Sequence, residues 1–85
     1  MYKILGFSVF ESKAGKKCCT IQLAKEFSDF EKKKGCLGLK IEKRRDGSDI
    51  FLPDSLMSLV SEENVGAECE AYFSASGGLM DIRIL

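Results

Sequence analysis

The segment KCCTIQLAKEF, residues 17–27, decides the fold, because apolar and polar side chains alternate along it for the length of a full strand. Residues that alternate with a period of two point to opposite faces of a β-strand. One face is therefore predicted to point into a core, and it carries Cys19, Ile21, Leu23 and Phe27. The opposite face is predicted to point outward, and it carries Cys18, Thr20, Gln22 and Ala24.

The residues before this segment predict its hairpin partner. Residues 2–12, YKILGFSVFES, are rich in aromatic and β-branched types, which are typical of strands. Residues 13–16, KAGK, form a tight connection in which Gly15 is free to adopt a positive φ. Gly6, inside the strand, indicates a bulge, a sharp bend or a close approach of another backbone. The face expected to point into the core carries Lys3, Leu5, Phe7 and Val9.

The residues after this segment predict a loop and a third strand. Residues 28–35, SDFEKKKG, are polar and are expected to form a loop. Residues 36–44, CLGLKIEKR, alternate again and predict a strand, whose inward side chains would be Leu37, Leu39 and Ile41. Residues 45–48 contain an Asp-Gly turn signal, and residues 49–52 are expected to pair briefly as a short strand.

The C-terminal part predicts a helix and a second hairpin. Apolar residues recur at helical spacing over residues 54–62, after a proline suited to a first helical turn. Residues 67–74 and 79–85 read as two strands joined by a Gly-Gly turn. In the last strand one face is expected to carry Met80, Ile82 and Ile84.

The element order is therefore β-β-β-α-β-β in a single domain, residues 1–85. This order predicts a mostly β fold: a small, five-stranded, OB-like Greek-key barrel with one short helix between strands 3 and 4. The competing SH3-like barrel usually lacks that helix. A closed or nearly closed barrel suits a small β protein because it removes exposed strand edges.

The composition argues against catalysis. The chain has no histidine, which removes the commonest general base and the commonest metal ligand. No catalytic constellation, phosphate-binding glycine loop or metal cluster emerges, so we expect a protein that is not an enzyme and needs no cofactor or metal. The four cysteines lack C-x-x-C spacing and are expected to be free thiols. The chain shows no membrane-spanning run and no signal-peptide pattern, and it is expected to be cytoplasmic.

The charge is neutral in sum but divided along the chain. Residues 1–45 hold twelve basic and five acidic residues, a net charge of +7, whereas residues 46–85 hold one basic and eight acidic residues, a net charge of −7. Such asymmetry indicates a binding face on a neutral molecule. The alternative is that the two halves neutralise each other in the fold.

The basic residues lie beside aromatic ones. Cations neutralise phosphates and flat side chains stack on bases, which are the two requirements of a site for single-stranded nucleic acid. In an OB-fold the binding groove lies over strands 2 and 3 and the loops 1–2 and 4–5. The candidate site therefore comprises the basic and aromatic residues Phe10, Lys13, Lys16, Lys17, Phe30, Lys32, Lys33, Lys34, Lys40, Lys43, Arg44 and Arg45. The pattern does not distinguish DNA from RNA, and the alternative function is a protein-interaction module that docks an acidic partner.

Three stretches resemble a known family. The hairpin SKAGKK at residues 12–17, the segment 66–74 opened by Gly66, and GGLMDIRIL at residues 77–85 resemble the single-stranded DNA-binding proteins of filamentous phages. Similar helix-destabilising proteins occur on mobile elements. The resemblance implies an OB-like barrel that forms a homodimer and coats single-stranded DNA during replication or transfer of a phage or plasmid. By position, it points first to Lys13, Lys16, Lys17 and Phe30, and then to Lys40, Lys43, Arg44 and Arg45. The chain departs from the family pattern in two ways, by the helix expected over residues 54–62 and by its acidic C-terminal half.

Overall fold

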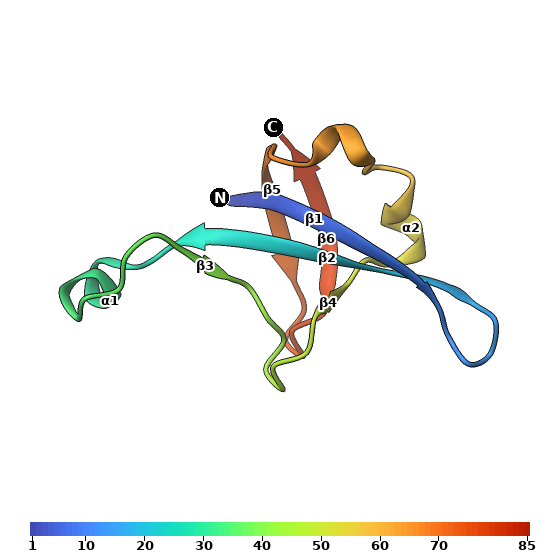
Figure 1. The fold of residues 1–85 in the computed structure, drawn as a ribbon, viewed down its shortest axis with the longest axis horizontal. Helices are drawn as coiled ribbons and strands as arrows, with labels where there is room; N and C mark the ends of the chain where they lie inside the picture. Colours follow the sequence, from blue (N-terminus) through green and yellow to red (C-terminus); the bar gives the residue numbers. More distant parts are fainter.

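The computed structural model describes residues 1–85 and contains six strands and three short helices (Figure 1). The strands are β1 (Tyr2–Glu11), β2 (Lys17–Glu26), β3 (Leu39–Ile41), β4 (Ile50–Phe51), β5 (Glu68–Phe73) and β6 (Leu79–Ile84). The helices are α1 (Asp29–Lys33), α2 (Asp54–Met57) and the 3₁₀ helix η1 (Glu62–Asn64). The molecule measures 46 × 28 × 20 Å, with the β1–β2 turn and α1 at opposite ends of its long axis (Figure 1).

The fold is mostly β, as the sequence predicts, but the six strands form one antiparallel sheet that does not close into a five-stranded barrel. The strand order is β3-β2-β1-β5-β6, and β4 pairs with β2 on the same edge as β3. Closure fails because the end strands β3 and β6 do not pair with each other. The contact between β1 and β5 is also short, since their ladder involves only Tyr2 and Lys3 of β1.

A bulge in β1 confirms the special role expected at Gly6. Ile4 pairs with Leu23 and Gly6 pairs with Gln22, which leaves Leu5 as the extra residue. An inserted residue shifts the alternation by one position, so Ile4 is buried before the bulge and Phe7 packs on the core after it. The predicted inward face of β1 is therefore wrong for Lys3 and Leu5, which are exposed. Val9 lies opposite the buried Cys19 and faces the core side as predicted, although it remains 59% exposed.

The core lies on one face of β2 and matches the prediction for that strand. Cys19, Ile21 and Leu23 are all buried there. They pack with seven further buried residues: Ile4, Ile50, Leu52, Leu56, Cys69, Leu79 and Ile82. Phe27 lies beyond the end of β2 and outside this cluster.

The opposite face of β2 is less open than the alternation implies. Thr20 and Ala24, predicted to point outward, are buried. Thr20 lies between Ser8 of β1 and Phe51 of β4, and Ala24 lies between neighbours on β1 and β3. Neighbouring strands on both edges cover these two small side chains.

The middle of the chain departs from the prediction. The expected loop at 28–35 contains α1, whose start is a capping box: the Glu31 amide donates to Ser28 Oγ at 3.2 Å, and the Ser28 amide donates to Glu31 Oε1 at 3.1 Å. The predicted strand at 36–44 shrinks to the three residues of β3. Its supposedly inward side chains are exposed, because β3 crosses only the end of β2 and no layer covers it: Leu37, Leu39 and Ile41.

Two further predictions are corrected in the C-terminal part. The helix expected over 54–62 ends at Met57, and η1 follows after a gap in which the Ser61 amide donates to Asn64 Oδ1 at 2.7 Å. Such side-chain bonds compete with a continuous helix. In β6 a register shift leaves Met80 unpaired and exposed, so Leu79 takes the buried position beside Phe73.

Candidate nucleic-acid interface

The predicted site residues occupy three separate places on the molecule. The β1–β2 turn and the start of β2 carry Lys13, Lys16 and Lys17; α1 and the residue after it carry Phe30 and Lys32–Lys34; and β3 with the β3–β4 connection carries Lys40, Lys43, Arg44 and Arg45. In Figure 1 these places lie at the right end, the left end and the lower rim of the sheet. The structure does not bring all of them onto one strip.

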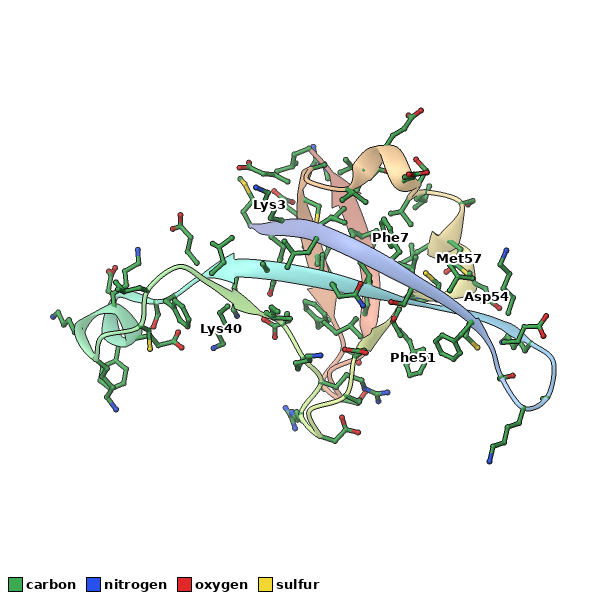
Figure 2. All side chains as sticks on the ribbon, in the orientation of Figure 1. Lys3, Phe7, Lys40, Phe51, Asp54 and Met57 are labelled. Carbon is green, nitrogen blue, oxygen red and sulfur yellow. The ribbon has the colours of Figure 1, made fainter.

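An exposed aromatic pair lies on the outer face of the sheet. Residues directly opposite each other in antiparallel strands share a face. Phe10 pairs with Cys18, and Phe51 pairs with Thr20 two positions further along β2, so both rings lie on the face opposite the core. The ring centroids are 6.2 Å apart with the planes tilted by 56°. Phe10 and Phe51 are 42% and 47% exposed, and Figure 2 shows the Phe51 side chain beside the hairpin.

Sequence reasoning missed Phe51. Residues 49–52 were expected to pair briefly, and β4 (Ile50–Phe51) confirms that strand. The strand that β4 pairs with, β2, was not predictable, because two residues are too short to show an alternating pattern. A partner assignment to β2 would have placed Phe51 on the same face as Phe10.

The three lysines of the hairpin differ in their surroundings. Lys16 Nζ lies 3.4 Å from Asp54 Oδ2, although both side chains are two-thirds exposed. Lys13 and Lys17 have no ion-pair partner. Lys17 lies on the core side of β2, two positions before Cys19, and it lines the groove described below. The hairpin therefore presents Lys13 as its most available cation, near the strand that carries Phe10.

The α1 segment carries a second exposed ring. Phe30 is 66% exposed, and Lys34 Nζ lies 4.6 Å from its ring centroid, a cation–π distance. Lys32, Lys33 and Lys34 are exposed and make no ion pair. Phe30 is thus a surface ring and does not plug the end of the sheet.

Strand β3 and the β3–β4 connection hold both neutralised and free cations. Lys40 Nζ lies 3.3 Å from Glu31 Oε2, and Lys43 pairs with Asp49. Arg44 and Arg45 have no carboxylate partner within 4.0 Å. Hydrogen bonds from Ser48 to the Asp46 carboxylate shape this turn and lower the pKa of Asp46.

The two oppositely charged halves neutralise each other only in small part at contact distance. Only two ion pairs join the basic residues of 1–45 to the acidic residues of 46–85, namely Lys16–Asp54 and Lys43–Asp49. The other two, Lys25–Glu42 and Lys40–Glu31, lie within residues 1–45. Eight of the twelve cations remain unpaired: Lys3, Lys13, Lys17, Lys32, Lys33, Lys34, Arg44 and Arg45.

The acidic side chains of β5 and β6 lie on the outer face of the β5–β6 hairpin. In the β5–β6 register, Glu70 lies opposite Arg83 and Tyr72 lies opposite Asp81. These four residues are on the face opposite the buried Cys69 and Ile82. Tyr72 Oη donates to Glu70 Oε2 at 2.6 Å, and this bond raises the pKa of Tyr72.

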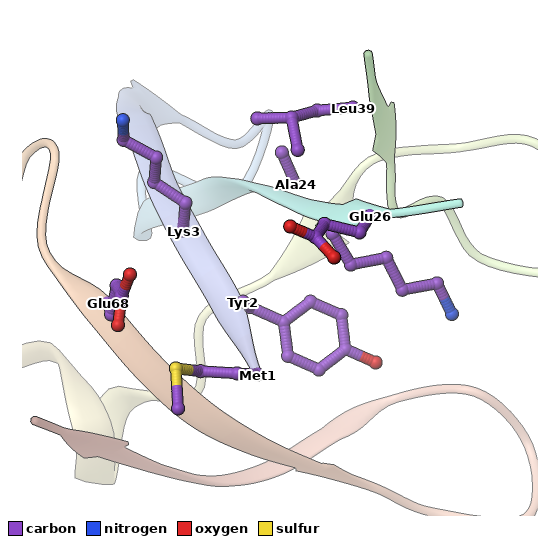
Figure 3. Close-up of a pocket in the computed structure, with 8 residues that line it drawn as sticks. Met1, Tyr2, Lys3, Ala24, Glu26, Leu39 and Glu68 are labelled. Carbon is purple, nitrogen blue, oxygen red and sulfur yellow. The ribbon is translucent and has the colours of Figure 1, made fainter. Parts of the chain in front are cut away.

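Two open grooves complete the surface. The first, of about 610 Å³, is lined by charges of both signs and by the Tyr2 ring; Figure 3 shows side chains from β1, β2, β3 and β5 around it. Lys25 Nζ lies 5.8 Å from the Tyr2 ring centroid beside this groove. The second groove is mostly apolar and lies between β1 and the segment that contains α2 and η1.

The structure holds neither a disulfide nor a cluster of metal-ligating side chains. All four cysteines are free, and no group of three or more His, Cys, Asp or Glu residues comes together as a metal site would require. None of the helices combines the length and the apolar character that a membrane span needs. Comparison with known protein families, curated proteins and solved structures found no match.

Proposed function

We propose that this protein binds single-stranded DNA without catalysing a reaction, through the outer face of the sheet around Phe10 and Phe51. The observation that carries the proposal is the pair of neighbouring, half-exposed rings on that face. Exposed aromatic side chains next to cations suit bases that are free to unstack. In a duplex the faces of the bases are stacked on each other, so such a platform favours single strands.

Each ring is close in sequence to a cationic turn. Phe10 leads into the hairpin with Lys13, and Phe51 follows the connection that contains Arg44 and Arg45. These cations have no ion-pair partner, so they are available to phosphates. A strand laid over the two rings would meet positive charge at both ends of the platform.

The α1 segment is proposed as an extension of the same footprint. Phe30 and the three lysines after it repeat the combination of ring and cation at the far end of the long axis (Figure 1). OB-type proteins cover about 4–16 nucleotides of single strand per fold. Contacts at both ends of the molecule would favour a footprint that spans its length.

The biological setting follows from the resemblance of residues 12–17, 66–74 and 77–85 to the phage proteins. We extend to this chain the role of coating single strands, as a homodimer, during replication or transfer of a phage or plasmid. Sequence-independent stacking and phosphate contacts suit this role, because every base has a π-face.

The test is a binding titration with fluorescent oligo-dT and a duplex of the same length at two salt concentrations. Tight binding to oligo-dT, weak binding to the duplex, and a loss of affinity with salt are expected. For single strands the log-log slope is about −0.7 per neutralised phosphate. Equal affinity for both nucleic acids, or no binding at low salt, would contradict the proposal.

A protein-interaction module that docks an acidic partner is the second candidate, because the eight unpaired cations would serve it equally well. The rings separate the two functions. Replacing Phe10 by Leu removes a stacking surface but leaves the charge unchanged, so it would weaken DNA binding and spare an electrostatic protein contact.

A further inference from the structure

The apolar groove between β1 and the α2–η1 segment has a volume of about 620 Å³. Phe7 and Val9 line it from β1, and Met57, Val60 and Val65 line it from the opposite side. Figure 2 labels Phe7 and Met57 on these facing elements. Val9 and Val65 are about half exposed, so the groove is an uncovered extension of the core.

The strand beside this groove has an unpaired edge. β1 meets β5 only at Tyr2 and Lys3. The Ile4 amide then donates to the Ala67 carbonyl, and the Ile4 carbonyl accepts from the Gly66 amide. Beyond this point, residues 5–11 have β2 on one side and no strand on the other. An open edge of this length is a template for adding another strand.

The hydrogen-bond phase of the hairpin identifies which groups face the open edge. The Ser12 amide donates to the Lys16 carbonyl, so Ser12 and Lys16 form a hydrogen-bonded pair. Antiparallel ladders alternate hydrogen-bonded and non-hydrogen-bonded pairs. Phe7, Val9 and Glu11 therefore direct their N–H and C=O groups away from β2. The Cys19 carbonyl, opposite Val9, agrees with this phase because it accepts from Leu52 of the β4 side.

We propose that the occupant of this edge is β1 of a second copy, paired antiparallel about a two-fold axis at Ser8. This inference rests on the homodimer of the proposed function and assigns its interface. In this register Phe7 of each copy lies opposite Val9 of the other, and both side chains face the apolar groove. The N–H and C=O groups of these two residues then bond across the axis. On the outer face Phe10 of one copy lies opposite Gly6 of the other, an arrangement in which an aromatic ring covers an edge glycine.

Charge complementarity favours a second copy over a foreign peptide. With the axis at Ser8, the hairpin tip of each copy extends past Leu5 of the other, towards the segment that holds η1 and the start of β5. That segment carries Glu62, Glu63 and Glu68, none of which has an ion-pair partner, whereas the tip carries the unpaired Lys13. The opposite charges of the two halves, left largely unpaired within one chain, would then meet between chains.

The first test is the mass of the full chain in solution by sedimentation equilibrium. Native protein is expected to have twice the 9.4 kDa of the chain. Val9→Lys places a charge at the centre of the edge and should yield a folded monomer, because Val9 is already 59% exposed. The matched control is Met80→Lys, which changes an exposed apolar residue on β6, an end strand of the sheet two positions from β1, and it should stay dimeric. A monomeric native protein, or a Val9→Lys variant that remains dimeric, overturns the proposal.

The second test reads the register and does not depend on how Val9→Lys folds. Cα atoms of a non-hydrogen-bonded pair are about 4.5 Å apart, which lies within the range of a disulfide. Ser8→Cys should therefore form an intermolecular disulfide between the two substituted positions on mild oxidation, identified by peptide mass spectrometry. Ser76→Cys, in the β5–β6 turn, should not form one. Absence of the link at position 8 overturns the proposed register. The dimer is tested at the edge of β1, whereas DNA binding can be tested at Phe51, which lies across β2 from that edge. Loss of dimerisation and loss of DNA binding are therefore separable results.

Discussion

Phe10 and Phe51 lie on strands at opposite edges of β2, yet their ring centroids are only 6.2 Å apart across it. Thr20, the position on β2 opposite Phe51, is buried while both rings are half exposed. Small buried residues under large exposed ones form a platform, because the rings lie on the sheet and are not enclosed by it.

The platform predicts a specific loss of DNA affinity. Phe10→Leu and Phe51→Leu should each weaken binding of oligo-dT by about 1–3 kcal/mol, the usual contribution of one base stacked on an aromatic ring. Fluorescence anisotropy measures the effect. Tyr72→Leu removes an equally exposed ring from the acidic β5–β6 face and should leave affinity unchanged. Equal losses in all three variants would show that the rings of Phe10 and Phe51 have no special role.

Free and paired cations should differ in the salt dependence of binding. Replacing both Arg44 and Arg45 by Gln should reduce the log-log salt slope by about 1.4, because two phosphate contacts are lost. Lys16→Gln should change the slope less, since Lys16 already pairs with Asp54. Titrations at a series of salt concentrations measure both. A larger effect at Lys16 than at the two arginines would contradict the assignment.

The core assignment predicts unequal stability losses at two isoleucines. Ile21→Ala should lower the free energy of unfolding by about 2–5 kcal/mol, because Ile21 is fully buried on the core face of β2. Ile41→Ala should cost about 0.5 kcal/mol, as for an ordinary surface position, because Ile41 is half exposed. Urea denaturation measures the difference, and comparable losses would mean that β3 also covers the core.

The start of α1 should depend on pH. Hydrogen bonds from Ser28, and secondarily the nearby Lys40, lower the pKa of Glu31 in the fold. A carboxyl with a lowered pKa stabilises the fold above its unfolded pKa, and this contribution is lost as pH falls through the folded pKa. Amide signals of α1 should therefore shift in the acid range, and Ser28→Ala should move the Glu31 midpoint upward in an NMR titration. An unchanged midpoint in that variant would contradict the capping box.

The four thiols should react in two classes. Burial raises the pKa of both Cys19 and Cys69, whereas Cys18 and Cys36 are partly exposed. Because the thiolate is the reactive species, alkylation of native protein at neutral pH should modify Cys18 and Cys36 first. Mass spectrometry over time measures the order. Early labelling of Cys69 would indicate that the β5–β6 hairpin opens readily.

The sequence predicted the local elements well where one periodicity ran unbroken. The inward residues of β2 and the two hairpins follow directly from alternation. It predicted α1 poorly, although Ser28 and Glu31 have capping-box spacing, because three lysines in a row suggested a loop. The candidate site was only partly predictable: Phe10 and the cations were singled out, while Phe51 was not.

By itself, the sequence determined that this chain is mostly β and that its charge is divided between two halves, since both properties depend on neighbouring residues. Only the tertiary structure decided which side chains point inward up to the bulges at Leu5 and Met80, because one inserted residue shifts the alternation by one position. The tertiary structure also decided that the sheet stays open and that the Phe51 ring lies beside the Phe10 ring. Both depend on pairings between segments far apart in the chain, which no local pattern encodes.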